Sequence, residues 1–274
     1  MTPILVGLVG LGLIRTVNAE VHRFERLAAT EISSLLSGDR KRVDIKSSVG
    51  PEAIFGDIHR VSIVASGFSS DGLPLYTEPW RSQRGVLHDL RIDMRDFTLR
   101  GLRVARLQAD IPDCRFDLAL ALRDHRFRLS RSGLGIGEVE VTAADLEAFI
   151  LAKFHEVKTA HVRMDRDKLF IEGRAELILL TTDFFIAARL EPAGGSRLVL
   201  THPRVLFDGN PADPELQKVL LEILNPVVDL DRDLGLSGAM KVDRVVLRNG
   251  TLRASGVTKI PSRERGTKTN APAL

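Results

Sequence analysis

The sequence predicts an α+β fold with one long, curved, antiparallel β-sheet and two or three helices. After residue 38, apolar residues recur with period two over most of the chain, which is typical of strands with one buried and one wet face. Three other segments have apolar residues three or four positions apart, which indicates amphipathic helices. A composition of 44% hydrophobic and 27% charged residues is sufficient for a large packed core.

The chain divides into three parts by composition. Residues 1–19 are a signal-like or anchor segment, because the apolar run at 3–14 is shorter than the ~20 residues that span a bilayer. Val17-Asn18-Ala19 resembles a small-residue cleavage site, although no Lys or Arg precedes the run. The alternative is an uncleaved apolar arm. Residues 20–261 are expected to form a single domain, and the basic segment 262–274 is expected to be a disordered tail.

The first amphipathic helix is predicted over residues 16–36. Its apolar face includes Ala28, Ile32 and Leu35, its opposite face is charged, and Gly38 is expected to end it. This face could pack on the core or lie on a membrane surface, and the sequence leaves both interpretations open.

The strand-like segments follow in series. Residues 114–129 alternate over an unusual length, and long strands in series favour an extended, curved sheet. Hairpin turns are predicted at 193–195 and at Asn249-Gly250, which is the strongest short-range hairpin signal. Further strands are predicted at 43–46, 59–65, 90–95, 157–164, 169–175, 177–190, 197–207, 242–247 and 252–257.

Two more helices and one long loop complete the expected elements. Thr142 can cap a helix that extends to about Phe154, with Asp145 three residues on. Asp213-Pro214 starts a second helix that ends before Asn225-Pro226. Residues 69–85 are rich in Gly, Pro and Ser, which is typical of a loop.

The chain lacks the motifs of a catalytic or metal site. The seven histidines have no helical ligand spacing with a Glu partner. Gly133, Gly135 and Gly137 precede a strand, whereas a nucleotide-binding loop precedes a helix, so they are interpreted as a flexible strand entry. Asp229, Asp231 and Asp233 alternate without a calcium-loop pattern after them, and Asp229 is expected to cap or bridge structure. Cys114 is expected to be a buried, inert thiol. The sequence therefore predicts no enzyme, no metal and no cofactor.

Three stretches in the same order suggest a family. They are 137–150 (GEVEVTAADLEAFI), 207–230 (FDGNPADPELQKVLLEILNPVVDL) and 242–256 (VDRVVLRNGTLRASG), preceded by the strand pair 90–104 (LRIDMRDFTLRGLRV). Together they resemble the LmeA-type phospholipid-binding family of bacterial envelope proteins, over roughly residues 57–260. The resemblance implies a tubular lipid-binding-like fold, with the curved sheet wrapped around helices. It also implies a phospholipid ligand, and it supplies no catalytic residues. The N-terminal segment, which lacks basic residues before its apolar run, and the 69–85 loop depart from the family pattern.

These observations predict a non-enzymatic protein that carries or senses phospholipid in an apolar cavity, because each buried CH₂ contributes roughly 0.8 kcal/mol. Arg91, Arg95 and Arg128 are candidates to pair with a lipid phosphate, although strand positions favour plain solvation. The predicted cavity-lining residues are Val61, Ile63, Leu90, Ile92, Leu118, Leu120, Phe149 and Leu220.

The expected partners are phospholipid and a membrane surface, with no nucleic acid. The expected location is the cell envelope, periplasmic or extracytoplasmic and membrane-associated, or the cytoplasm if the N-terminal segment is not a signal. The main alternative is a structural or scaffolding envelope protein with a solid core. A lipid hydrolase or transferase, and an arginine-rich nucleic-acid binder with steep salt dependence, are the other rivals.

Overall fold

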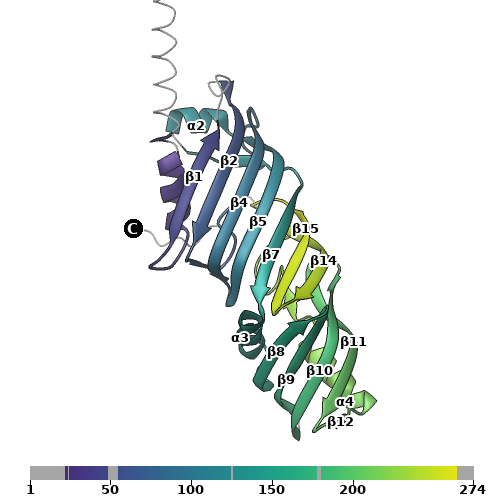
Figure 1. Ribbon diagram of the computed structural model, residues 1–274. Coiled ribbons are helices and arrows are strands. Elements are labelled where there is room, and N and C mark those ends of the chain that lie inside the picture. The colour runs from purple at the N-terminus through teal and green to yellow at the C-terminus, as the bar shows by residue number, and fades with distance from the viewer. Residues whose placement is uncertain (1–21, 24, 49–54, 125, 178–179, 264–274) are drawn as a thin grey trace, which may run out of the picture.

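The computed structural model of the chain describes residues 22–23, 25–48, 55–124, 126–177 and 180–263. The structure is α+β and mostly strands, with a curled antiparallel sheet that forms a half-barrel (Figure 1). The predicted fold class is confirmed, with the difference that the strands are divided between two sheets placed end to end. The signal-like segment 1–19 and residues 264–274 lie outside the described residues.

The larger sheet has nine strands among the described residues, in the order β1-β2-β4-β5-β7-β15-β14, with β3 and β6 added beside β4 and β5. Its centre is the β4–β5 hairpin, whose two strands have 15 residues each. Strand β2 pairs with β4 in parallel, which departs from the predicted antiparallel order. The strands are β1 (Arg42–Ser48), β2 (Asp57–Ser66), β3 (Ser69–Ser70), β4 (Gly85–Leu99), β5 (Leu102–Phe116), β6 (Leu129–Arg131), β7 (Gly135–Thr142), β14 (Met240–Arg248) and β15 (Thr251–Thr258).

The smaller sheet has six strands within the described ranges, in the order β12-β11-β10-β9-β8, with β13 beside β11. Every pairing recorded in it is antiparallel. Its strands are β8 (Val157–Asp165), β9 (Lys168–Leu177), β10 (Leu180–Ala193), β11 (Arg197–Phe207), β12 (Asn210–Pro211) and β13 (Val228–Asp229).

The two sheets meet along β14. The backbone N–H of Asp167 donates to the carbonyl of Leu247 at 3.1 Å, and the N–H of Val242 donates to the carbonyl of Gly195 at 2.8 Å. The buried apolar residues of both sheets form one continuous cluster. Hydrogen bonds and shared core therefore both cross the junction.

Glycines form the tight turns and the close strand contacts. Asn249 and Gly250 have φ of 51° and 73°, as a two-residue hairpin of this kind requires, so the predicted hairpin is confirmed. A Cβ on Gly135 would lie 2.0 Å from the carbonyl oxygen of Asp110, and one on Gly133 would lie 2.1 Å from that of Pro112. These glycines are needed because the backbone passes close to β5 at the entry to β7.

The helices at both predicted caps are confirmed. Helix α3 (Ala143–Lys153) begins at Thr142, whose hydroxyl accepts from the N–H of Asp145 at 3.2 Å. Helix α4 (Pro214–Leu224) begins at Asp213, whose carboxylate accepts from the N–H of Glu215 at 2.9 Å. Residues 22–23 and 25–34 are helical as predicted, and we call this segment the N-terminal helix.

The prediction of one strand over residues 114–129 is wrong. Strand β5 ends at Phe116, and Leu118 and Leu120 lie in helix α2 (Leu118–Asp124). Leu and Ala are among the strongest helix formers, and the carboxylate of Asp117 accepts from the N–H of Leu120 at 3.2 Å. Propensity and a helix cap therefore outweigh the alternating pattern in LALALRD.

The loop at 69–85 is held to the end of the described chain. Thr77 is 2% exposed, its N–H donates to the carbonyl of Pro261, and the N–H of Arg263 donates to the carbonyl of Thr77, both at 2.9 Å. The first two residues of the predicted tail are therefore ordered against this loop.

Candidate lipid-binding site

A pocket of about 240 Å³ lies between the larger sheet and the N-terminal helix. Its lining is mainly apolar and comes from strands, from the N-terminal helix, from the 69–85 loop and from the segment before β6. The lining residues are Ala28, Glu31, Ile32, Leu35, Ile45, Val61, Ile63, Pro74, Leu75, Tyr76, Glu78, Leu90, Phe127, Arg128, Leu129 and Arg263.

Three neighbouring strands form the floor of this pocket. Ile45 of β1 lies opposite Ile63 of β2, and Val61 of β2 lies beside Leu90 of β4. All four side chains are buried. Because side chains alternate between faces along a strand, the same face of all three strands is apolar here.

The cover of the pocket comes from three separate segments. The N-terminal helix places Ala28, Ile32 and Leu35 against the floor, which uses the apolar stripe that the sequence predicted. Leu35 is 50% exposed although it lines the pocket, so the pocket reaches solvent beside the end of this helix. Tyr76 from the loop lies under the guanidinium of Arg263, at 5.3 Å from the ring centroid.

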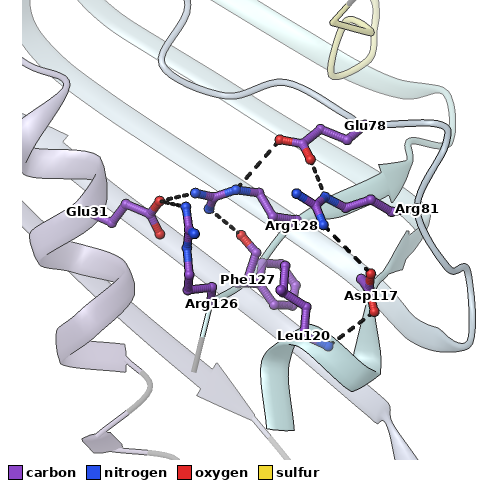
Figure 2. A network of polar contacts seen from close by, with 8 residues as sticks. All are labelled: Glu31, Glu78, Arg81, Asp117, Leu120, Arg126, Phe127 and Arg128. Carbon is purple, nitrogen blue, oxygen red and sulfur yellow. Dashed lines mark hydrogen bonds and ion pairs between the residues drawn. The ribbon is translucent and has the colours of Figure 1, made fainter. Parts of the chain in front are cut away.

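A network of ion pairs, which we call the rim network, ties this cover to the sheet (Figure 2). Arg128 donates to Glu31 of the N-terminal helix and to the carbonyl of Phe127, and its Nε lies 3.7 Å from Oε1 of Glu78. Glu78 also accepts from Arg81, which lies 4.0 Å from Asp117 at the start of α2. The network therefore joins the N-terminal helix, the loop and α2.

The rim network changes the ionisation of its members. The hydrogen bond from Arg128 lowers the pKa of Glu31, and the same bond raises the pKa of Arg128. Both groups are therefore charged at neutral pH, and the N-terminal helix is held by an ionic contact that is only partly exposed to solvent.

Arg263 differs from Arg128 in its partners. Its guanidinium contacts the Tyr76 ring, and within residues 22–263 as described it has no carboxylate within ion-pair distance. A guanidinium that lines an apolar pocket and has no carboxylate partner among the described residues is suited to an anionic group.

The structure separates the residues that were predicted to line a cavity. Val61, Ile63 and Leu90 line the pocket, whereas Ile92 is buried further along β4. Leu118 and Leu120 lie half-buried on α2. Phe149 on α3 and Leu220 on α4 are buried elsewhere in the core.

The three candidate phosphate partners also separate. Arg91 and Arg95 are exposed and pair with carboxylates, as their strand positions suggested. The bond from Arg95 is the main reason why the pKa of Asp93 is lowered to about 2. Arg128 alone reaches the pocket.

The other polar groups singled out in the sequence have structural partners. Asp229 accepts from the N–H groups of Asp231 and Arg232, and Asp233 accepts from Lys153 at 2.5 Å. Cys114 is buried, and burial raises the pKa of its thiol. In the described part of the chain, no three metal-ligating side chains gather together, and no helix there is long and apolar enough to cross a membrane.

A curled sheet with an apolar, helix-covered pocket defines a class of protein suited to apolar ligands. Comparison with family models agrees, because residues 83–257 match the family described as LmeA-like phospholipid-binding. The match covers well over half of the chain, and the protein belongs to this family. No curated protein and no solved structure gives a significant match.

The pocket draws on residues inside and outside the matched region. Leu90, Phe127, Arg128 and Leu129 lie inside it. The N-terminal helix, β1, β2, the tip of the loop and Arg263 lie outside it. Sequence reasoning found the strand floor from its alternation, and it missed the loop and Arg263 because neither has an apolar period.

Proposed function

We propose that this protein binds phospholipid without catalysis, with acyl chain in the pocket under the N-terminal helix and the phosphate at its rim. The observation that supports this most directly is an apolar pocket, lined also by Arg128, Arg263, Glu31 and Glu78, in a member of a phospholipid-binding family. The pocket needs no hydrogen bond to the acyl chain of the lipid, since burial of its methylene groups supplies the affinity.

The volume of the pocket sets how much lipid it accepts. A cavity of about 150 Å³ holds one benzene molecule, so roughly ten carbons fit in the 240 Å³ available here. Burying about ten methylenes contributes about 8 kcal/mol before the costs of binding. One chain segment of this length is held, and the rest of a longer chain leaves through the opening beside Leu35.

A phospholipid with two chains needs more room than the closed pocket has. The N-terminal helix is the element that can yield. It is attached to the rest of the domain by Glu31, by its short apolar stripe, and by Glu25, which accepts from the N–H and the hydroxyl of Ser47 on β1. Displacing this helix leaves the floor strands paired and intact. The rim network and the Glu25–Ser47 hydrogen bonds therefore set the cost of admitting the second acyl chain.

The headgroup phosphate is expected to bind at Arg263 and Arg128. Arg263 offers a guanidinium without a carboxylate partner among the described residues. Arg128 loses one of its two carboxylate partners when Glu31 moves away with the helix and keeps its contact with Glu78. Guanidinium groups bind phosphate in a bidentate manner. Both arginines line the same pocket, and we propose that one phosphate contacts both.

The wider role follows from a lipid ligand. We place the protein at a membrane surface of the cell envelope, where it carries or senses phospholipid. If the N-terminal segment is not a signal and stays uncleaved, the protein is cytoplasmic instead. The mass of the mature N-terminus from native cells distinguishes the envelope location from the cytoplasmic one. A scaffolding role with a filled core is the alternative, and it predicts no saturable lipid site.

Titration with a fluorescent fatty acid and with a labelled phospholipid tests the proposal. Both ligands should saturate at one site, and an unlabelled phospholipid should displace each. Absence of saturable binding for both, in protein stripped of bound lipid and still folded, would refute the proposed function and favour the scaffold.

A further inference from the structure

We propose that the outer face of the smaller sheet docks onto the surface of anionic phospholipid bilayers, at the end of the molecule away from the pocket. This deepens the membrane contact in the proposed function and names a surface for it. The observation is a basic hollow with two phenylalanines on an uncovered sheet face. Figure 1 shows α4 behind this sheet and no helix in front of β9 and β10.

The hollow has a volume of about 680 Å³ and spans β9, β10 and β11. Phe170 pairs across the strands with Ala187, which in turn pairs with Arg204. The register shifts between Ala187 and Arg189, so two small alanines form the floor where larger side chains would otherwise stand. Phe185 forms a wall, with its ring 6.3 Å from that of Phe170.

The charge around the hollow is positive and unpaired. Lys168, Arg189 and Arg204 line it, and none of them has a carboxylate within 4.0 Å among the residues that the structure describes. His202 lines it too, and no carboxylate does. This contrasts with Arg174 on the same sheet, which pairs with Asp183 at 2.8 Å.

The carboxylates on this face lie next to the hollow and do not neutralise it. Glu172 and Glu191 follow Phe170 and Arg189 along their strands, and neither makes an ion pair with a described residue. Arg163 adds a further cation on β8, and its guanidinium lies 4.5 Å from the ring centroid of Phe170. A third carboxylate, Asp165, is the cross-strand partner of Lys168 and lies 3.7 Å from Arg166. The four cations around the hollow therefore stand against three carboxylates.

A bilayer suits this arrangement better than nucleic acid does. Clusters of basic residues are attracted to anionic lipid surfaces, and each Lys or Arg near the surface raises the membrane affinity about fivefold. Nucleic-acid bases need free aromatic faces for stacking. Arg163 already covers Phe170, so the aromatic rings here are suited to contact with lipid between the cations.

Vesicle co-sedimentation tests this inference with the full chain. The variant Lys168→Gln/Arg189→Gln/Arg204→Gln removes three charges from the face. The control Arg60→Gln/Arg91→Gln/Arg95→Gln removes three exposed charges from the larger sheet, where each has a carboxylate partner. Vesicles of phosphatidylcholine alone are compared with vesicles that also contain phosphatidylglycerol.

We expect the wild-type protein to bind the anionic vesicles, and the face variant to lose binding on the order of 100-fold. The control should lose much less, and both variants should melt near the wild-type temperature. The face variant should still bind a fluorescent fatty acid, which separates failure of docking from failure of the pocket.

Several results would overturn the docking proposal. They are no vesicle binding by the wild-type protein, equal binding to neutral vesicles, equal losses in the face variant and the control, or binding of single-stranded RNA in place of vesicles. A folded partner protein captured by the face in competition with vesicles would also overturn it.

Discussion

Filling the pocket from its floor should weaken lipid binding strongly while the fold remains. Val61 is buried on β2 and lines the pocket, and Val61→Phe adds about four carbons on the side that faces the empty volume. Val64 lies on the same strand with its side chain 43% exposed. Val64→Phe is therefore a matched control with the same chemical change on the wet face.

The size of the effect follows from the volume of the pocket. Of room for roughly ten carbons, about six would remain. Losing the burial of about four methylenes removes about 3 kcal/mol from the free energy of lipid binding. This corresponds to a roughly 200-fold larger dissociation constant. The added ring occupies empty volume, so the melting temperature should stay within a few degrees of the wild-type value.

Fluorescent fatty acid titration measures this loss, with Val64→Phe unchanged. If Val61→Phe is folded and binds the probe as tightly as the wild-type protein does, the ligand does not lie on this floor, and the assignment of the pocket is wrong.

The other predictions concern the rim network, a helix cap and a close strand contact. Glu31→Gln should raise affinity for two-chain phospholipid about fivefold, since a partly exposed ion pair contributes about 1 kcal/mol, and it should leave fatty acid affinity unchanged; trypsin cleavage of the N-terminal helix should rise in parallel. Because the folded-state pKa of Glu31 is lowered, the contact is present above the ordinary glutamate value and is lost as pH falls through the lowered one, so acid should reproduce this effect in the wild-type protein alone. Thr142→Ala should lower the free energy of unfolding by about 1 kcal/mol in urea titration, and Thr142→Ser should restore it; equal stability of all three would contradict the cap. Gly135→Ala should cost several kcal/mol or prevent folding, because its Cβ would meet a backbone oxygen at 2.0 Å. Gly72→Ala, whose Cβ would meet the Tyr76 hydroxyl at an ordinary contact distance of 3.8 Å, should be nearly neutral.

Much of the fold could be predicted from periodicity and turn chemistry. The alternation in β2 and β4, the caps at Thr142 and Asp213 and the hairpin at Asn249 all follow from local rules, and the structure confirms them. Local rules did not locate α2, because alternating Leu and Ala satisfy a strand pattern and a helix propensity at once.

Long-range order could not be predicted in the same way. The division into two sheets depends on which strand edges meet β14, and the parallel pairing of β2 with β4 depends on the course of the 69–85 loop. Neither is encoded in a window of neighbouring residues. For this reason Phe149 and Leu220, correctly predicted on apolar helix faces, contribute to the core away from the pocket.

Part of the candidate site was visible in the sequence. Val61, Ile63 and Leu90 share one face because of strand alternation, and Ile32 belongs to the predicted helix stripe. Arg263 and Tyr76 are 187 positions apart in the chain and are brought together by backbone and side-chain hydrogen bonds at Thr77. A contact of that kind has no sequence signature.

Native mass spectrometry of the protein purified from its own cells tests the central claim most directly. We expect a population whose added mass equals one phospholipid per chain, and we expect Val61→Phe to lose that population while Val64→Phe retains it. A single species at the mass of the unliganded polypeptide, which also takes up no phospholipid when mixed with vesicles, would contradict a lipid-holding interior.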